Sequence, residues 1–212
     1  HSQSKDMYKY TKLKTSILLS GVLILLTSFN TANAQDLQIK HIKSDIFTAV
    51  YSERYQQPLE VSYTIQCPTG STSRKGLNFY TCDSVETSDN KDYVDNIYDK
   101  GHLAPAAAFN CDRETLKKTF TYLNCALQHQ SLNRGPWKEL ERFERNLAKV
   151  YAFVSVTITV HFNDTLDNWL PTGALVPTGF SKIIWCDGEH FEFYFPNTDV
   201  KGQDWITFKT GK

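Results

Sequence analysis

The sequence predicts an α+β fold with a mostly antiparallel central sheet and flanking helices. Several segments alternate apolar and polar residues, which is the period of a strand with one buried face. One segment repeats apolar residues at helical spacing. Strands lie on both sides of this helical middle instead of alternating with helices, and no internal repeat is present, so a parallel βαβ sheet is not expected.

The first predicted strand covers residues 59–65, where Leu, Val, Tyr and Ile alternate with polar residues. The turn-forming run 67–71 ends this strand, and the polar run 72–76 that follows is predicted to be an exposed loop. Residues 87–96 are again polar and irregular, which indicates an exposed approach to the segment that follows.

An amphipathic helix is predicted after Pro136. This proline suits the first helical turn, where its missing N–H group has no intrahelical partner to lose. The apolar stripe that we expect to face the core consists of Trp137, Leu140, Phe143, Leu147 and Val150.

A strand and then a β-hairpin follow the helix. Residues 154–162 form the clearest strand of the chain, with Val, Ile and Phe alternating with Ser, Thr and His. Residues 183–185 and 191–195 flank the run 186–189, which has the Asp-Gly pair typical of a β-hairpin turn.

Residues 1–34 are predicted to be an upstream extension and a secretory signal peptide. Met7 is the only methionine, and three lysines, a mostly apolar run from Ile17 to Leu26 and an Ala-Asn-Ala sequence at 32–34 follow it. A membrane anchor is the alternative, but a spanning helix needs about 20 apolar residues. We therefore expect a secreted, extracytoplasmic protein with a single domain at 35–212 and no stable membrane association after cleavage.

The charge balance of that domain is slightly acidic. The full chain has 23 basic and 23 acidic side chains, and residues 1–34 contain four lysines and one aspartate, which leaves 19 against 22. Proteins that hold nucleic acid by bulk electrostatics are strongly basic. Any nucleic-acid site in this chain must therefore be a local patch.

Five cysteines lie in the predicted domain, where export makes disulfides chemically available. An odd number leaves at least one cysteine without an intramolecular partner. The pairs nearest in sequence are Cys67 with Cys82 and Cys111 with Cys125, although spacing alone does not fix the connectivity. No two cysteines have the short separation of paired ligands in a structural zinc site.

His102 is the best candidate for a general base. Gly101 before it and Pro105 after it indicate a strand end or tight turn, where an imidazole can face a cleft. An isolated histidine is more often an ordinary buried or surface residue. We apply that interpretation to the other histidines of the predicted domain, which are His41, His129, His161 and His190.

Asn133, Glu141 and Arg145 strengthen the case for His102. Their separations of eight and four residues place them on one side of a helix, if the helix includes Asn133. An amide oxygen and a carboxylate suit Mg²⁺, which binds few protein groups and keeps several waters. The alternatives are a helix cap for Asn133 and a surface ion pair between Glu141 and Arg145.

Three motifs together closely resemble the DNA/RNA non-specific endonuclease family, which belongs to the ββα-metal, or His-Me finger, nucleases. The resemblance covers residues 51–197, and its ordered, multi-part pattern makes it specific. The motifs are Asp99-Lys100-Gly101-His102-Leu103-Ala104-Pro105, Tyr122-Leu123-Asn124-Cys125-Ala126-Leu127-Gln128, and Leu132-Asn133-Arg134-Gly135-Pro136-Trp137 with Leu140-Glu141.

The resemblance implies a ββα-metal motif in the fold and a role for each matching residue. His102 matches the general base of the family, and Asn133 matches its Mg²⁺ ligand. Glu141 matches the acid that holds metal-bound waters. Arg145 matches an arginine that contacts phosphate.

Four further residues complete the predicted site. By resemblance, Asp99 opens the first motif and Asn124 supports the site. Lys100 stands where the family usually has arginine, so it keeps the positive charge but loses the bidentate fork. From the exposed loop at 72–76, Arg74 is a candidate substrate-binding residue.

The implied function is Mg²⁺-dependent hydrolysis of DNA and RNA by a secreted endonuclease with little sequence preference. The resemblance implies 5′-phosphate products. We expect the His102 imidazole to titrate near its ordinary pKa of about 6.5. The alternatives are an inactive relative that binds nucleic acid or a partner protein, and a secreted phosphodiesterase that acts on small molecules.

Overall fold

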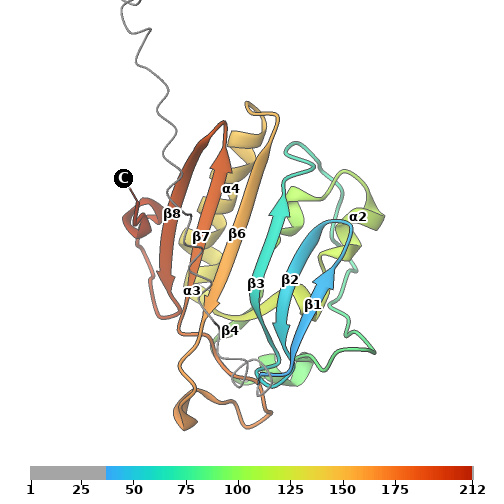
Figure 1. Ribbon diagram of the computed structural model, residues 1–212, viewed down its shortest axis with the longest axis vertical. Coiled ribbons are helices and arrows are strands. Elements are labelled where there is room, and N and C mark those ends of the chain that lie inside the picture. Colours follow the sequence, from blue (N-terminus) through green and yellow to red (C-terminus); the bar gives the residue numbers. More distant parts are fainter. Residues whose placement is uncertain (1–36, 212) are drawn as a thin grey trace, which may run out of the picture.

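The computed structural model describes residues 37–211 and shows an α+β architecture built on a six-stranded antiparallel sheet (Figure 1). The strand order is β1-β2-β3-β6-β7-β8, so sequence neighbours pair except where β3 meets β6. The strands are β1 (Ile39–Lys43), β2 (Phe47–Ser52), β3 (Gln57–Thr64), β6 (Val154–His161), β7 (Gly179–Cys186) and β8 (Glu189–Pro196).

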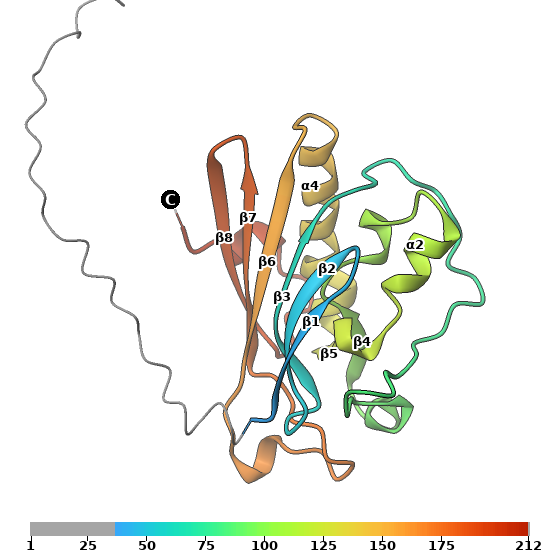
Figure 2. The ribbon, with the colours of Figure 1, turned by 45° about the vertical axis from the view of Figure 1, so that its right-hand side comes forward.

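The long excursion between β3 and β6 carries a second, two-stranded sheet. Its strands are β4 (Tyr98–His102) and β5 (Cys125–His129), which pair antiparallel. Helix α3 (Gln130–Leu132), the π-type turn η4 (Asn133–Trp137) and helix α4 (Lys138–Ala148) follow directly. Strands β4 and β5 with α4 form the ββα unit, and α4 lies against one face of the large sheet (Figure 2).

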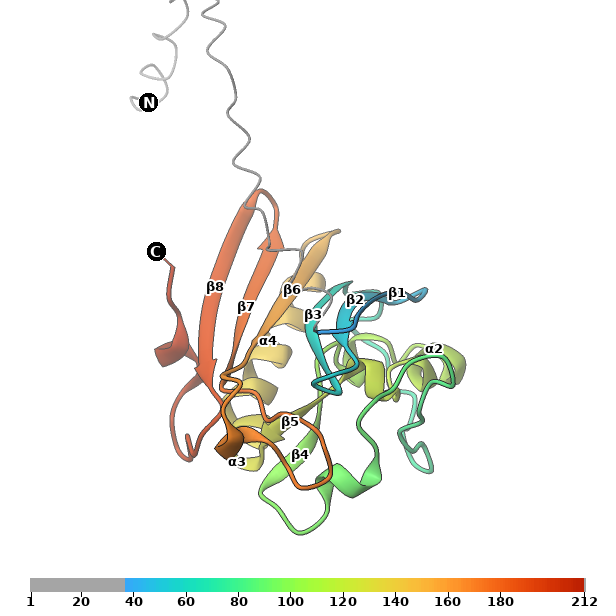
Figure 3. The same ribbon diagram turned by 60° about the horizontal axis from the view of Figure 1, so that its bottom comes forward.

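Short helices complete the described chain. Helix α2 (Arg113–Lys118) lies beyond the β1 edge of the large sheet, close to the chain that connects β3 to β4 (Figure 3). The 3₁₀ segments are η1 (Asn90–Tyr93), η2 (Ala106–Ala108), η3 (Tyr122–Asn124), η5 (Leu166–Asn168) and η6 (Trp205–Phe208).

The main core lies between the large sheet and α4. Val154, Val156, Ile158 and Val160 of β6 are buried, whereas the residues between them are partly or fully exposed. Trp137 contributes a fully buried indole that contacts the rings of β7 and β8 edge-on. Burial of each large apolar side chain contributes about 1.5–3 kcal/mol, so this alternating face anchors α4 to the sheet.

The predicted α+β class with a mostly antiparallel sheet is confirmed. The strand expected at 59–65 is β3, the strand expected at 154–162 is β6, and the hairpin turns at Asp187 and Gly188. Both turn residues have positive φ angles, of 50° and 77°, which a two-residue hairpin with the strand twist requires.

The helix begins close to its predicted start but ends earlier than predicted, and the condition that it includes Asn133 is not met. A kink at Gly135 separates Asn133 from the regular helix, which begins at Lys138. At the other end α4 stops at Ala148, so Val150 lies outside it and is 76% exposed, not part of the core stripe. A final turn, in which Val150 and Tyr151 both donate to the carbonyl of Leu147, ends the helix early.

The two cysteine pairs nearest in sequence do not form, and the connectivity that the sequence left open is settled by one disulfide. The disulfide joins Cys67 to Cys111, and Cys82, Cys125 and Cys186 are free thiols. The chain after β3 runs beside the segment after η2, where the Cys67 amide donates to the Ala108 carbonyl at 3.0 Å. The fold brings Cys67 next to Cys111, which is 44 positions away, so the pairing follows the fold and not the separation in sequence.

The predicted signal peptide at 1–34 lies outside the described residues. Within residues 37–211, no helix has the length and apolar character needed to cross a bilayer.

Candidate active site

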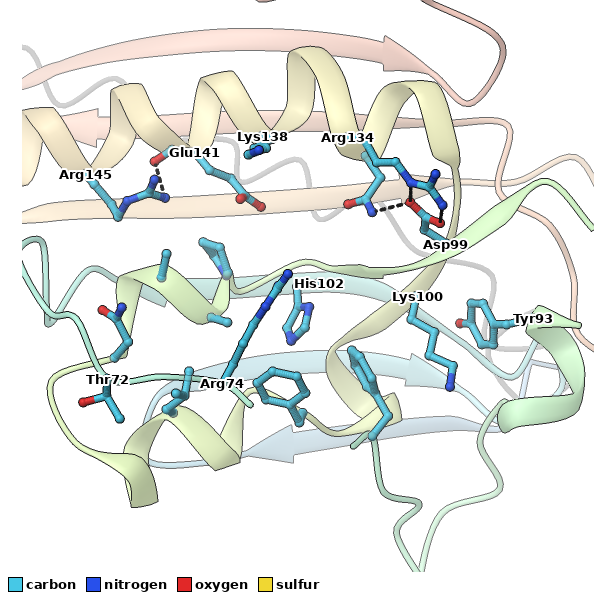
Figure 4. A pocket seen from close by; sticks show the side chains of 18 of the residues that line it. Thr72, Arg74, Tyr93, Asp99, Lys100, His102, Arg134, Lys138, Glu141 and Arg145 are labelled. Carbon is cyan, nitrogen blue, oxygen red and sulfur yellow. Dashed lines mark hydrogen bonds and ion pairs between the residues drawn. The ribbon is translucent and has the colours of Figure 1, made fainter. Parts of the chain in front are cut away.

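A pocket of about 770 Å³ lies between α4 and β4 (Figure 4). Its walls come from the loop at 72–79, from β4, from the segment 105–120 and from the η4–α4 region. Seven residues that the sequence predicts for the site line this pocket, whereas Asn124 is not among the lining residues. The seven are Arg74, Asp99, Lys100, His102, Asn133, Glu141 and Arg145.

His102 ends β4 with its imidazole packed between two aromatic rings. The ring centroids of Phe79 and Phe120 lie 4.7 and 4.8 Å from the imidazole centroid. Burial, with a smaller contribution from the charge of Arg74, lowers the pKa of His102 to about 3. The expected value near 6.5 is therefore wrong, because burial disfavours the charged imidazolium. The ring stays neutral at physiological pH, and its buried Nε2 has no hydrogen-bond partner among the described residues.

Asn124 braces the backbone immediately after His102. This fully buried side chain accepts a hydrogen bond from the Ala104 amide at 2.7 Å and donates to the Ala104 carbonyl at 2.9 Å. It also donates to the Thr119 carbonyl at 3.0 Å. These three hydrogen bonds tie the backbone that follows β4 to the segment from Thr119 to Asn124, so the end of β4 has one fixed geometry.

Asp99 organises the opposite end of the pocket. Its carboxylate accepts from Asn133 Nδ2 at 2.8 Å and from Arg134 Nε and Nη2 at 2.8 and 2.6 Å. Burial of Asp99 favours the neutral acid, but the hydrogen bonds from Arg134 and Asn133 outweigh it and hold its pKa below the usual range. Because the amide nitrogen of Asn133 is committed to Asp99, Oδ1 is the atom available to a ligand in the pocket.

The kink at Gly135 lets Asn133 and the residues of α4 face one pocket without a continuous helix. Gly135 has φ −108° and ψ −115°, outside the helical region, and its neighbours Asn133 and Lys138 are helical. Glu141 and Arg145 then project from successive turns of α4 along the pocket wall (Figure 4). Arg145 Nη1 donates to the backbone carbonyl of Glu141 at 3.0 Å.

The Glu141 carboxyl has an unusual electrostatic environment. Burial is the main cause that raises its pKa to about 7, Lys182 opposes this rise, and the neighbouring Glu144 carboxylate adds to it. A cation in the pocket would favour the charged form. Glu141 is therefore poised to ionise when positive charge is bound nearby.

A buried polar network lies beneath α4 on the sheet side. Lys182 of β7 donates to Glu144 at 2.8 Å, and both side chains are 0% exposed. The hydroxyl of Tyr63 donates to the other Glu144 oxygen at 2.8 Å, and Lys182 Nζ lies 3.8 Å from the centroid of the Trp137 ring. This network fixes α4 against β3 and β7.

Lys100 lines the pocket, but its ammonium group points away from His102 (Figure 4). It donates to Asn90 Oδ1, which also accepts from the Tyr122 hydroxyl at 2.8 Å. The rings of Phe79, Tyr93 and Tyr122 surround the ammonium with centroids 5.6 to 5.9 Å away. Phe79 therefore contacts both His102 and Lys100.

A sequence profile of the DNA/RNA non-specific endonuclease family matches residues 27–210. The chain belongs to this family. The family resemblance noted in the sequence is thereby confirmed, and the match spans all the residues that line the pocket.

Relatives of this family member include mitochondrial nucleases. Over 90 residues the chain is 34% identical to the mitochondrial endonuclease G of Bos taurus and of Homo sapiens, which covers 41% of this chain and 30% of each relative. The mitochondrial nuclease of Saccharomyces cerevisiae is 33% identical over 107 residues, or 44% of this chain and 32% of that protein. The chain thus matches less than a third of the length of these relatives.

A solved structure shares the fold. The crystal structure of the EndoG/EndoGI complex superposes with a TM-score of 0.71 over 82% of this chain and 80% of that chain, at 22% sequence identity. This likeness supports the α+β fold.

The donor set of the pocket fits a hard divalent cation. No cluster of three or more His, Cys, Asp or Glu side chains suited to a metal occurs within residues 37–211. The Asn133 amide oxygen with the Glu141 carboxylate offers few protein ligands and leaves room for water, which is the mode that Mg²⁺ prefers.

Several pocket residues were missed by sequence reasoning. Phe79 and Phe120 flank His102 from distant segments, and no local pattern marks them. Arg134 binds Asp99 across 35 positions of sequence. Lys138 could have been found, since it lies one helical turn before Glu141.

Proposed function

We propose that this protein is an endonuclease that hydrolyses phosphodiester bonds of DNA and RNA with little sequence preference. One observation carries the proposal: a neutral imidazole with a buried Nε2 and an oriented amide oxygen face a single pocket that also holds a carboxylate and several cationic side chains. These are the groups that metal-assisted hydrolysis of a phosphodiester requires.

His102 acts as the general base in this proposal. Its imidazole accepts a proton from the attacking water, which then adds to phosphorus in line with the leaving oxygen. Burial keeps the ring neutral, so it can accept a proton at the start of each turnover. The imidazolium formed in this step must return that proton to solvent before the next turnover. The Phe79 and Phe120 rings and the Asn124 brace restrict its orientation.

Asn133 and Glu141 would hold a divalent cation, Mg²⁺ or a similar hard ion. Bound there, such an ion would supply positive charge to the phosphate and the departing oxygen. Asp99 positions the Asn133 amide by accepting its N–H group, and Glu141 orients water in the pocket.

Arg145, Arg74 and Lys138 add positive charge along the pocket wall. Contacts of this type are made to phosphate oxygens and carry little sequence information. The ammonium of Lys100 lies on the aromatic side of the pocket, away from His102. Lys100 therefore stabilises a phosphate of the nucleic-acid backbone next to the one that is cleaved.

We also propose that the chain is exported, with residues 1–34 removed as an upstream extension and signal peptide. The Cys67–Cys111 disulfide supports this, since such bonds persist in oxidising compartments. The mitochondrial names of the relatives make the alternative a mitochondrial address. The intact mass of protein recovered outside the cytoplasm should match a chain that begins at Gln35.

Digestion of plasmid DNA and of structured RNA, with Mg²⁺ and with EDTA, tests the proposed activity. We expect nicking and then linearisation of the plasmid, with fragments that carry 5′-phosphates. A chromogenic small-molecule phosphodiester serves as the comparison substrate. Faster cleavage of that compound than of DNA would favour a small-molecule phosphodiesterase, and binding of DNA without cleavage would favour an inactive relative.

A further inference from the structure

The turn that carries Arg74 is held from outside the pocket by a second arginine. Arg74 begins a tight turn in which its carbonyl accepts from the Leu77 amide at 3.0 Å. Gly76 occupies the third position of this turn with φ +79°, a conformation that other residues adopt at a cost. The Arg74 side chain extends from the turn into the pocket beside His102 (Figure 4).

Arg113 contacts the two carbonyls on either side of Arg74. Its Nη1 donates to the Ser73 carbonyl at 3.1 Å, and its Nη2 donates to the Lys75 carbonyl at 3.2 Å. A planar guanidinium can make both contacts at once because its donors form a rigid fork. Together with the bond to Leu77, three consecutive carbonyls of the turn are engaged.

The base of the same loop is fixed to the same partner segment. The disulfide joins Cys67 to Cys111, the Thr72 amide donates to the Asn110 carbonyl at 3.0 Å, and the Thr72 hydroxyl donates to the Cys111 carbonyl at 3.1 Å. Arg113 is the first residue of α2, whose start is set by the Asp112 cap on the Thr115 amide at 2.8 Å. The anchor for the tip of the loop is therefore itself held in place.

We propose that Arg113 is a positioning residue that places Arg74 for contact with the phosphate of the substrate. This inference rests on the proposed function. Arg113 does not line the pocket, so it acts through the turn and not through contact with substrate. Small displacements of a group that stabilises the transition state reduce the rate strongly, and an exposed loop without the clamp samples many positions.

A double-mutant cycle on DNA cleavage tests the proposal. Arg113→Gln in the parent should lower kcat/KM by about tenfold, mainly through kcat, whereas in an Arg74→Gln background it should change kcat/KM by less than about twofold. Arg113→Lys retains the charge but lacks the fork, so it should stay well below the parent. Lys117→Gln, which removes an exposed charge from the same helix, is the matched control and should cut like the parent.

Three outcomes would overturn the proposal. Equal losses in the two backgrounds would show that Arg113 acts independently of Arg74. Full recovery with Arg113→Lys would show a bulk charge effect, and parent-like cleavage by Arg113→Gln would show no role.

Hydrogen exchange provides a readout that does not require activity. The Leu77 amide should exchange faster in Arg113→Gln than in the parent, while amides of β6 keep their protection and the melting temperature stays within about 2 °C. Unchanged exchange at Leu77 would refute the clamp itself. If the parent fails to cut nucleic acid but the Leu77 amide still exchanges faster in Arg113→Gln than in the parent, the proposed function is refuted and the clamp is supported.

Discussion

Lys182 and Glu144 form a buried ion pair whose disruption has a calculable effect. Lys182→Met removes the ammonium 2.8 Å from Glu144 and leaves that carboxylate, 0% exposed, with the Tyr63 hydroxyl as its hydrogen-bond donor. An uncompensated charge of this kind costs about 3–5 kcal/mol, a large part of a typical stability of about 5–15 kcal/mol. In a domain of this size 1 kcal/mol shifts Tm by about 2–4 °C, so Tm should fall by about 6–20 °C.

Urea denaturation and thermal unfolding, both followed by tryptophan fluorescence, measure this effect. Adding Glu144→Gln to Lys182→Met removes the unpaired charge and should recover most of the lost stability, because a neutral amide still accepts from Tyr63. Lys118→Met, which breaks the exposed pair with Asp45, is the matched control and should leave Tm nearly unchanged. A Tm within about 2 °C of the parent for Lys182→Met, or no recovery in the double variant, would refute the reasoning.

Three other predictions concern the pocket. His102→Ala should reduce cleavage of DNA and RNA by about 10²–10⁴-fold and leave the fold intact, whereas His161→Ala, outside the pocket, should cut nearly as well as the parent; equal losses in plasmid assays would exclude His102 as the base. Asn133→Ala should demand far more Mg²⁺ for activity, and a Mg²⁺ titration identical to that of the parent would contradict the ligand assignment. The folded-state pKa of His102 is about 3 and the unfolded value is about 6.5, so the unfolded chain binds an extra proton between these values. As the pH is lowered through this window, the stability of the parent should therefore decrease more steeply than that of His102→Ala. Urea midpoints with parallel pH dependence would count against the lowered pKa.

The parts of the fold that could be predicted from sequence are those set by local patterns. β3 and β6 follow from alternation, because a strand with one buried face shows it directly, and the hairpin follows from its Asp-Gly turn. The end of α4 could not be placed, since Val150 fits the stripe by spacing and the final turn decides otherwise. The disulfide could not be placed either, because it depends on where the chain after β3 meets the segment after η2.

The predicted site residues gather in one pocket, yet their electrostatics depend on partners far away in sequence. Phe79 and Phe120 lower the pKa of His102 by enclosing it, and neither belongs to its motif. Asp99, 34 positions away in sequence, accepts the amide N–H of Asn133 and so orients its amide oxygen into the pocket. Glu144 looks like a surface residue of a charged helix, and only the position of Lys182 on β7 shows that it is buried.

The insertion of the whole site between two paired strands has a consequence for biosynthesis. β3 is complete at Thr64, but its hydrogen-bonding partner β6 is made only at residues 154–161, with Glu60 opposite Thr159. Until that stretch is available, α4 lacks the sheet face against which it packs, and a nascent chain cannot hold Glu141 and Arg145 opposite His102. Cleavage competence should therefore arise late and abruptly, so a truncated or stalled chain poses little hazard to the nucleic acids of the cell that makes it.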